Sequence, residues 1–202
     1  MNPNDPTKQL LNAVNNNHPE EVNTALKNGA NIEWKDSQNR TPLMLAVRAK
    51  HIEVAKILIE NNANVNAQDN IQDTPFLYAG AEGLTEIVRL SMQNGADYTI
   101  FNRYNGSALI PACERGHVET VAEILKDKDF PIDHINRLGW TALLEAVILG
   151  HGGKNHIQIV DMLIKAGADL NIPDFDGVTS LQHAKRKGQK EIVKLLEAAG
   201  AK

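Results

Sequence analysis

The chain has 202 residues, enough for one sizeable domain or two small ones, and it is 42% hydrophobic but only 4% aromatic. This composition indicates a core of aliphatic side chains, as in closely packed helices. A net charge of −4 argues against nucleic acid or an anionic membrane as the main partner, and a single cysteine excludes an intramolecular disulfide.

Residues 1–6 contain two prolines and two asparagines, and we expect them to form a flexible lead-in. They show no basic start followed by an apolar run, so they do not resemble a secretion signal. No stretch approaches about 18 consecutive apolar residues, so no membrane-spanning helix is expected. Together with the lone cysteine, these features predict a cytoplasmic protein with no membrane partner.

A repeated pattern begins near residue 7 and continues to the end of the chain. In each clear copy a Thr or Ser is followed two residues later by an apolar anchor, and successive hydroxyls are separated by 33, 33, 34 and 38 residues. These hydroxyl residues are Thr41, Thr74, Ser107, Thr141 and Thr179. An Asp or Asn precedes each of them by five residues, namely Asp36, Asp69, Asn102, Asn136 and Asp174.

Each recurring feature predicts a local structure. The Asp or Asn starts a turn, because its side chain accepts hydrogen bonds from nearby backbone N–H groups. The Thr or Ser caps a short helix, and Pro42 and Pro75 fit its first position, where a missing N–H is harmless. A longer helix with an apolar stripe follows, as in "HIEVAKILIE". Residues suited to a positive φ end both kinds of helix: Gly83, Gly116 and Gly188 for the short ones, and Gly29, Asn62, Gly95, Gly167 and Gly200 for the longer ones.

The repeat is therefore a turn, a short helix, a tight loop and a longer helix. One copy cannot bury its apolar faces alone, whereas stacked copies can. The pattern resembles the ankyrin repeat, in motifs such as "TPLMLAV" at Thr41 and "NGAN" at Asn28. The resemblance implies an all-α solenoid of helix-turn-helix repeats joined by β-turn or hairpin-like loops. We expect one domain over residues 7–202, with six repeats at about 7–35, 36–68, 69–101, 102–135, 136–173 and 174–202, the first and last acting as caps.

Two departures from the family pattern carry expectations of their own. The His that usually follows T-P-L is absent, so we expect apolar contacts to replace its hydrogen bonds. Its replacements are Met44, Leu77, Ile110, Leu144 and Gln182. The fifth repeat carries five extra residues within "LGHGGKNHIQ", and we expect them to form a finger that projects from the loop between its two helices.

In ankyrin-repeat proteins the turn tips and the exposed side of the first helices form a concave face that usually binds partners. Alignment by the capping hydroxyl therefore predicts a protein-binding surface. Its residues are Arg40, Ile71, Asp73, Arg103, Tyr104, Glu114, Arg115, Arg137, Leu138, Trp140, Ile148, Leu149, Phe175, Asp176 and Val178. Apolar side chains gather on the turns of the last three repeats, and exposed aromatic clusters mark contact sites. In the alternative interpretation, Trp140 and Phe175 fold down and fill gaps between neighbouring turns.

No catalytic, cofactor or metal site is expected. Cys113 lies where a first helix faces its neighbours, so we interpret it as a core residue. His51 and His117 occupy the family's helix-joining position. His151 and His156 have no Cys or carboxylate close by, and "GHGGKN" lacks the spacing of a phosphate-binding loop. The basic run at residues 185–190 is interpreted as a solvated face of the last repeat.

The sequence thus favours a non-enzymatic, monomeric module that binds an unidentified partner protein and needs no cofactor. Three alternatives stay open, because a fold does not fix a function. The chain could be a small-molecule-binding protein or an enzyme that uses the concave groove, or a secreted effector that acts on a host protein.

Overall fold

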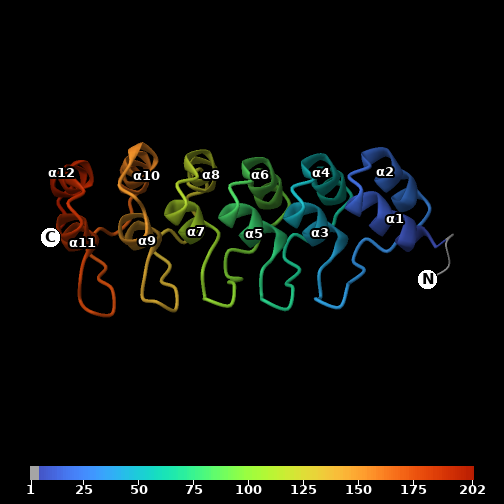
Figure 1. Ribbon diagram of the computed structural model, residues 1–202, viewed down its shortest axis with the longest axis horizontal. Coiled ribbons are helices and arrows are strands. Elements are labelled where there is room, and N and C mark those ends of the chain that lie inside the picture. Colours follow the sequence, from blue (N-terminus) through green and yellow to red (C-terminus); the bar gives the residue numbers. More distant parts are fainter. Residues whose placement is uncertain (1–4) are drawn as a thin grey trace. The chain divides into compact units, whose positions relative to one another are not determined.

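The computed structural model describes residues 5–202, and over this range it contains helices, turns and loops but no strand (Figure 1). The helices alternate between first and second members of pairs. They are α1 (Pro6–Asn15), α2 (Pro19–Lys27), α3 (Pro42–Arg48), α4 (Ile52–Glu60), α5 (Pro75–Ala81), α6 (Thr85–Gln93), α7 (Leu109–Glu114), α8 (Val118–Ile124), α9 (Ala142–Ile148), α10 (Lys154–Lys165), α11 (Ser180–Arg186) and α12 (Lys190–Ala198).

The start of α1 differs from the flexible lead-in expected over residues 1–6. Residues 1–4 lie outside the described part of the chain, but Asp5 and Pro6 are ordered into the helix start. Asp5 is the N-cap and accepts a hydrogen bond from the Thr7 backbone N–H at 2.8 Å. Pro6 takes the first helical position, so these two residues start the helix as Asp and Pro commonly do.

The chain divides into two compact units, each built from stacked helix pairs. The first holds residues up to 79 together with 86–100, and the second holds residues 80–85 together with 101–202. In the first unit α1 packs on α2 and α3, and α4 packs on α2 and α3. In the second unit the first helices α7, α9 and α11 pack in sequence, as do the second helices α8, α10 and α12. Helices of like kind therefore lie side by side within each unit.

Five turns share one hydrogen-bonding pattern, which confirms the turn expected at each Asp or Asn. In the turn before α9, the Asn136 side-chain oxygen accepts from the backbone N–H groups of Leu138 (2.9 Å) and Trp140 (3.1 Å). The Asn136 N–H in turn donates to the Trp140 carbonyl at 3.0 Å. Asp36, Asp69, Asn102 and Asp174 make the same set of bonds in their turns. One side chain therefore fixes each turn.

The expected helix caps form in four of the five cases. The hydroxyl groups of Thr41, Thr74, Thr141 and Thr179 each accept from the backbone N–H three residues later. Ser107 does not cap a helix, and α7 begins two residues later with Ala108 as its N-cap. The cause is Pro111. The equivalent residue in the next repeat is Glu145, whose backbone N–H donates to the carbonyl oxygen of the cap residue Thr141 and so makes the first hydrogen bond of α9. Proline has no N–H to donate there.

This difference predicts unequal costs for two matched substitutions. Thr141→Ala should lower the free energy of unfolding by about 1 kcal/mol, because it removes the acceptor for the Leu144 N–H. Ser107→Ala removes a hydroxyl that makes no cap bond, so its cost should stay below about 0.5 kcal/mol. Urea unfolding of both variants measures the two values. Equal losses in the two variants would show that the cap bond of Thr141 adds no stability beyond that of a hydroxyl without one.

Aliphatic side chains fill the core, as the composition predicts. Leu109, Leu143 and Leu144 of the first helices and Ile124 and Ile159 of the second helices are buried in the second unit. Each such side chain contributes about 1.5–3 kcal/mol of hydrophobic stabilisation relative to an exposed one. The four apolar residues that replace the family's usual His are buried as expected. Gln182 is exposed instead, and it completes a capping box with Thr179.

The extra residues of the fifth repeat do not form the projecting finger that we expected. Several of them extend α10 to 12 residues, compared with 9 in α4, α6 and α12. The ring of His156 is buried and its Nε2 donates to the Glu114 carbonyl oxygen at 2.9 Å, while Asn155 donates to the Gly116 carbonyl oxygen at 3.1 Å. The insertion therefore caps the carbonyl end of α7, because those carbonyl groups lack partners within their own helix.

Candidate protein-binding site

The second compact unit presents three turns that lead into α7, α9 and α11 (Figure 1). Their tips carry the largest exposed apolar side chains of this unit: Tyr104 is 54% exposed, Leu138 is 52% exposed and Phe175 is 77% exposed. The turns are held by main-chain hydrogen bonds to Asn102, Asn136 and Asp174, so the tip side chains are not needed to shape them. We call Tyr104, Leu138 and Phe175 the tip residues.

A hollow of about 200 Å³ lies between the first two of these turns and their helices. We call it the α7–α9 hollow. Its lining is formed by Asn102, Tyr104, Gly106, Ile110, Pro111, Glu114, Asn136, Leu138, Glu145 and Leu149. The walls are thus mainly apolar, and the polar side-chain groups of the lining residues are two carboxylates, two amides and the Tyr104 hydroxyl. Apolar surface with a few placed polar groups is typical of a binding site.

Glu145 is the most perturbed acid that lines this hollow. It is 5% exposed, and its Oε1 accepts a hydrogen bond from Asn136 Nδ2 at 2.9 Å. Burial raises the pKa of Glu145 to about 7, and the nearby Glu114 carboxylate adds to the rise, whereas the Asn136 hydrogen bond opposes it. Near neutral pH this side chain is therefore divided between its charged and neutral forms.

The structure brings several of the predicted contact residues together and separates others. Tyr104, Glu114, Leu138 and Leu149 line the α7–α9 hollow. Arg103 lies beside it, with its guanidinium 4.5 Å from the centre of the Tyr104 ring. The remaining exposed members in this unit are Arg115, Arg137, Phe175 and Asp176. Arg115 is engaged within the unit, since its Nη1 lies 2.7 Å from Glu82 Oε1.

Three apolar residues of the predicted surface are less available than expected. Val178 is only 7% exposed, and its backbone N–H closes the turn by donating to Asp174. Trp140 and Ile148 are half-buried. Phe175 stays exposed although its ring lies against the preceding turn, the one before α9. A Cβ atom at Gly139 in that turn would come within 2.8 Å of the Phe175 ring. The gap-filling alternative thus describes one side of the Phe175 ring, while the rest of the ring faces solvent.

The other predicted residues belong to the first compact unit. Arg40 is half-buried and pairs with Asp36 of its own turn at 2.6 Å. Ile71 is exposed and lines a separate hollow of about 210 Å³ with Gln38, Arg48, Asp69 and Asn70. Asp73 is half-buried, and its N–H donates to Asp69. Two of these three residues, Arg40 and Asp73, therefore take part in closing their turns.

Some residues of the hollow were not predicted from the sequence. Ile110, Pro111 and Glu145 lie on the first helices, but on the side that faces the turn. Alignment by the capping residue places Glu145 four positions after Thr141, where the other repeats have Leu45, Tyr78, Pro111 and His183. The acidic residue at this position was the signal in the sequence that could have identified Glu145 as part of the site.

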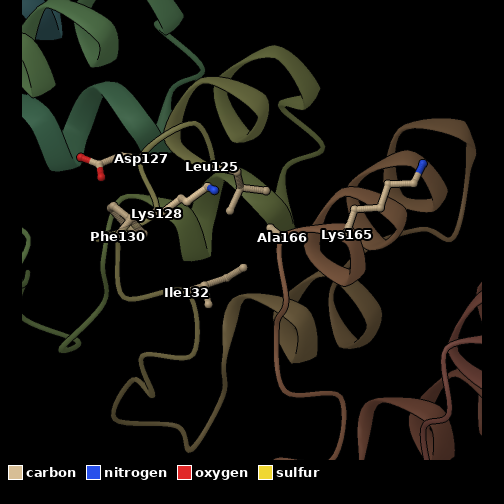
Figure 2. Close-up of a pocket in the computed structure, with 7 residues that line it drawn as sticks. All are labelled: Leu125, Asp127, Lys128, Phe130, Ile132, Lys165 and Ala166. Atoms are coloured by element: carbon tan, nitrogen blue, oxygen red, sulfur yellow. The ribbon is translucent and has the colours of Figure 1, made fainter.

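A larger hollow of about 470 Å³ lies beyond the ends of α8 and α10, between Leu125, Phe130 and Ile132 (Figure 2). Its two lysines do not converge, and Lys165 instead pairs with Asp161 at 2.6 Å.

Burial raises the pKa of the Cys113 thiol, which disfavours the reactive thiolate. Within residues 5–202 no group of three or more His, Cys, Asp or Glu side chains is placed to hold a metal ion. None of the helices in the same range combines the length and the apolar character that crossing a bilayer requires.

The sequence matches a known family model over most of its length. The model, described as "Ankyrin repeats (3 copies)", matches twice, over residues 10–102 and 76–174. The chain is 41% identical over 105 residues to the ankyrin repeat protein YahD of Escherichia coli (strain K12), covering 52% of each protein. It is 32% identical over 87 residues to protein phosphatase 1 regulatory subunit 27 of Mus musculus, covering 43% of this chain and 53% of that protein. The chain thus spans about half the length of these curated relatives.

Two solved structures are similar over nearly the whole chain. One is the crystal structure of an ankyrin repeat domain from Acinetobacter baumannii AYE, with 51% identity and a TM-score of 0.91, covering 96% of this chain and 98% of that one. The other is the ankyrin repeat protein EF0377, with 40% identity and a TM-score of 0.91, covering 97% of this chain and 98% of that one. The expected all-α ankyrin-repeat solenoid class is therefore confirmed.

Proposed function

Because this chain belongs to the ankyrin-repeat family, we propose that it binds a partner protein through the turns and first helices of its second compact unit. Ankyrin-repeat proteins are generally non-enzymatic interaction modules. The observation that carries the proposal is the surface around the α7–α9 hollow, where Tyr104 and Leu138 expose large apolar side chains beside an open apolar depression. The similarity to a regulatory subunit of a phosphatase supports a role in binding another protein.

The shape and chemistry of this surface fit a protein partner. Exposed Tyr and Leu side chains next to a hollow supply the apolar centre that protein interfaces use, and aromatic residues dominate their binding energy. Arg103 and Arg137 flank that centre on the turns and give it a polar rim. We also propose that the protein is a cytoplasmic monomer that binds neither nucleic acid nor membrane. The net charge of −4 and the buried lone cysteine support this part of it.

A triple substitution of the tip residues tests the proposal. Tyr104→Ala/Leu138→Ala/Phe175→Ala should weaken binding of the partner by at least about 30-fold, since one buried interface aromatic is worth about 2 kcal/mol or more. The melting temperature should change little, because the three side chains are exposed and the turns are fixed by other groups. Quantitative affinity capture from extracts of the source cells identifies the partner, and calorimetry with the purified partner measures the loss.

Ile135→Ala is the matched control. Ile135 is 41% exposed and belongs to the same unit, but it does not line the hollow. Its substitution should leave partner binding unchanged. If the triple variant and the control bind the partner as tightly as the wild type, the partner uses another surface and the proposal is wrong.

A further inference from the structure

Two carboxylates line the α7–α9 hollow, and none of its ten lining residues is basic. Glu114 is the last residue of α7, and Glu145 lies in the first turn of α9. Arg115 follows Glu114 in the chain, but its guanidinium is used elsewhere, with Nη1 donating to Glu82 and to the Ala81 carbonyl oxygen at 2.7 Å each. The hollow therefore combines apolar walls with two acidic side chains and no basic one.

Glu145 is buried with only part of its carboxylate satisfied. The Asn136 bond to Oε1 is the one hydrogen bond that this carboxylate makes to the described residues. A buried carboxylate is costly unless it is paired and fully hydrogen-bonded. Because Glu145 lines the open hollow, a donor from outside the chain can reach its unpaired oxygen.

The surrounding basic residues of the unit do not fill this role. Arg103 and Arg137 lie at the exposed turn tips and do not line the hollow. The Arg103 guanidinium is stacked over the Tyr104 ring. His183 of α11, the next helix packed on α9, is paired with Asp174 at 2.7 Å. Among residues 5–202, no basic side chain lines the hollow or pairs with Glu114 or Glu145.

We propose that the α7–α9 hollow receives one basic side chain of the partner protein, with its cationic group between Glu114 and Glu145 and its apolar stem against Ile110 and Leu138. This inference rests on the proposed function and names the chemistry that the partner presents. An arginine suits the site best. Its planar guanidinium offers several donors to two carboxylates, is weakly hydrated, and stacks on an aromatic ring such as Tyr104.

Selection of peptides on the purified full chain tests the inference. A phage-displayed library of random peptides is selected on the wild type, and binders that also bind the Tyr104→Ala/Leu138→Ala variant are removed. The remaining peptides should share one Arg or Lys beside apolar residues. In a synthetic peptide of this set, replacing Arg with the uncharged isostere citrulline (for Lys, with acetyl-lysine) should weaken binding to the wild type by about tenfold or more.

The carboxylates are tested by a double-mutant cycle. The double variant Glu114→Gln/Glu145→Gln should bind the basic peptide and its uncharged form with equal affinity. Glu119→Gln removes an exposed carboxylate of α8 and should keep the full difference between the two peptides. Peptides that need Tyr104 and Leu138 but share no basic residue, or a citrulline swap without effect, would overturn the inference and leave the proposed function standing. A wild-type chain that selects no peptide dependent on the tip residues would count against both.

Discussion

Gly150→Ala should lower the free energy of unfolding by about 3 kcal/mol, because the buried loop after α9 has no space for one more carbon atom. A Cβ atom at Gly150 would lie 2.0 Å from the Ala146 carbonyl oxygen and 2.3 Å from Cδ2 of His156. The first of these is a backbone atom and cannot rotate away. Displacing His156 would also break its hydrogen bond to the Glu114 carbonyl oxygen.

A second glycine in the same loop provides the control. Gly153 is the exposed N-cap of α10 with an extended backbone, and a Cβ atom there would meet nothing within 4 Å. Gly153→Ser should change stability by less than about 0.5 kcal/mol, because serine is a favoured cap residue. Chemical unfolding followed by circular dichroism gives both values. A Gly150→Ala variant within about 1 kcal/mol of the wild type would mean that the His156 contact is loose.

Glu145→Gln should stabilise the protein at alkaline pH and leave its stability almost unchanged at acidic pH. In the folded chain the pKa of Glu145 is raised to about 7 from an ordinary value of 4.5, so the folded state holds a proton that the unfolded state has already lost. Stability is therefore highest below the unfolded value, and it falls as pH rises through the folded value. Solvent at the mouth of the hollow limits the effect to about 1–2 kcal/mol.

The measurement is a comparison of urea unfolding at about pH 4 and about pH 8. The Gln variant should be more stable than the wild type at the higher pH only, since its side-chain oxygen can still accept from Asn136. Glu119→Gln, at an exposed position, should show no such dependence. If Glu145→Gln is less stable than the wild type at the higher pH, the charge at Glu145 is already compensated in the folded protein.

Local features of the fold could be predicted from the sequence because their causes are local. An Asp or Asn five residues before a Thr fixes a turn by bonding to its own neighbours, as Asn136 and Asp174 do. Glycines such as Gly83 and Gly116 have the positive φ that was expected of them. The failure at Ser107 was also local, since Pro111 is visible in the sequence and lacks the N–H that the first helical bond requires.

The hollow and the insertion could not be predicted in the same way, because both depend on contacts between repeats. The pKa of Glu145 is raised mainly because the folded chain buries this side chain, and the Glu114 carboxylate of another helix adds to the rise. The residues of "LGHGGKNHIQ" were expected to form a loop, but Asn155 and His156 lie in α10 and donate to carbonyl groups at the end of α7. Val178 was expected at the surface, yet its side chain is buried in the folded unit.

The turns have a consequence for how this molecule can change over evolution. Each turn keeps its shape through one Asp or Asn and the backbone groups that it holds, so the residues at the tips carry little of the folding energy. Mutations at Arg103, Tyr104, Arg137 or Leu138 can therefore accumulate without unfolding the protein. A new affinity can arise by replacing a few side chains, while the scaffold that displays them is inherited intact.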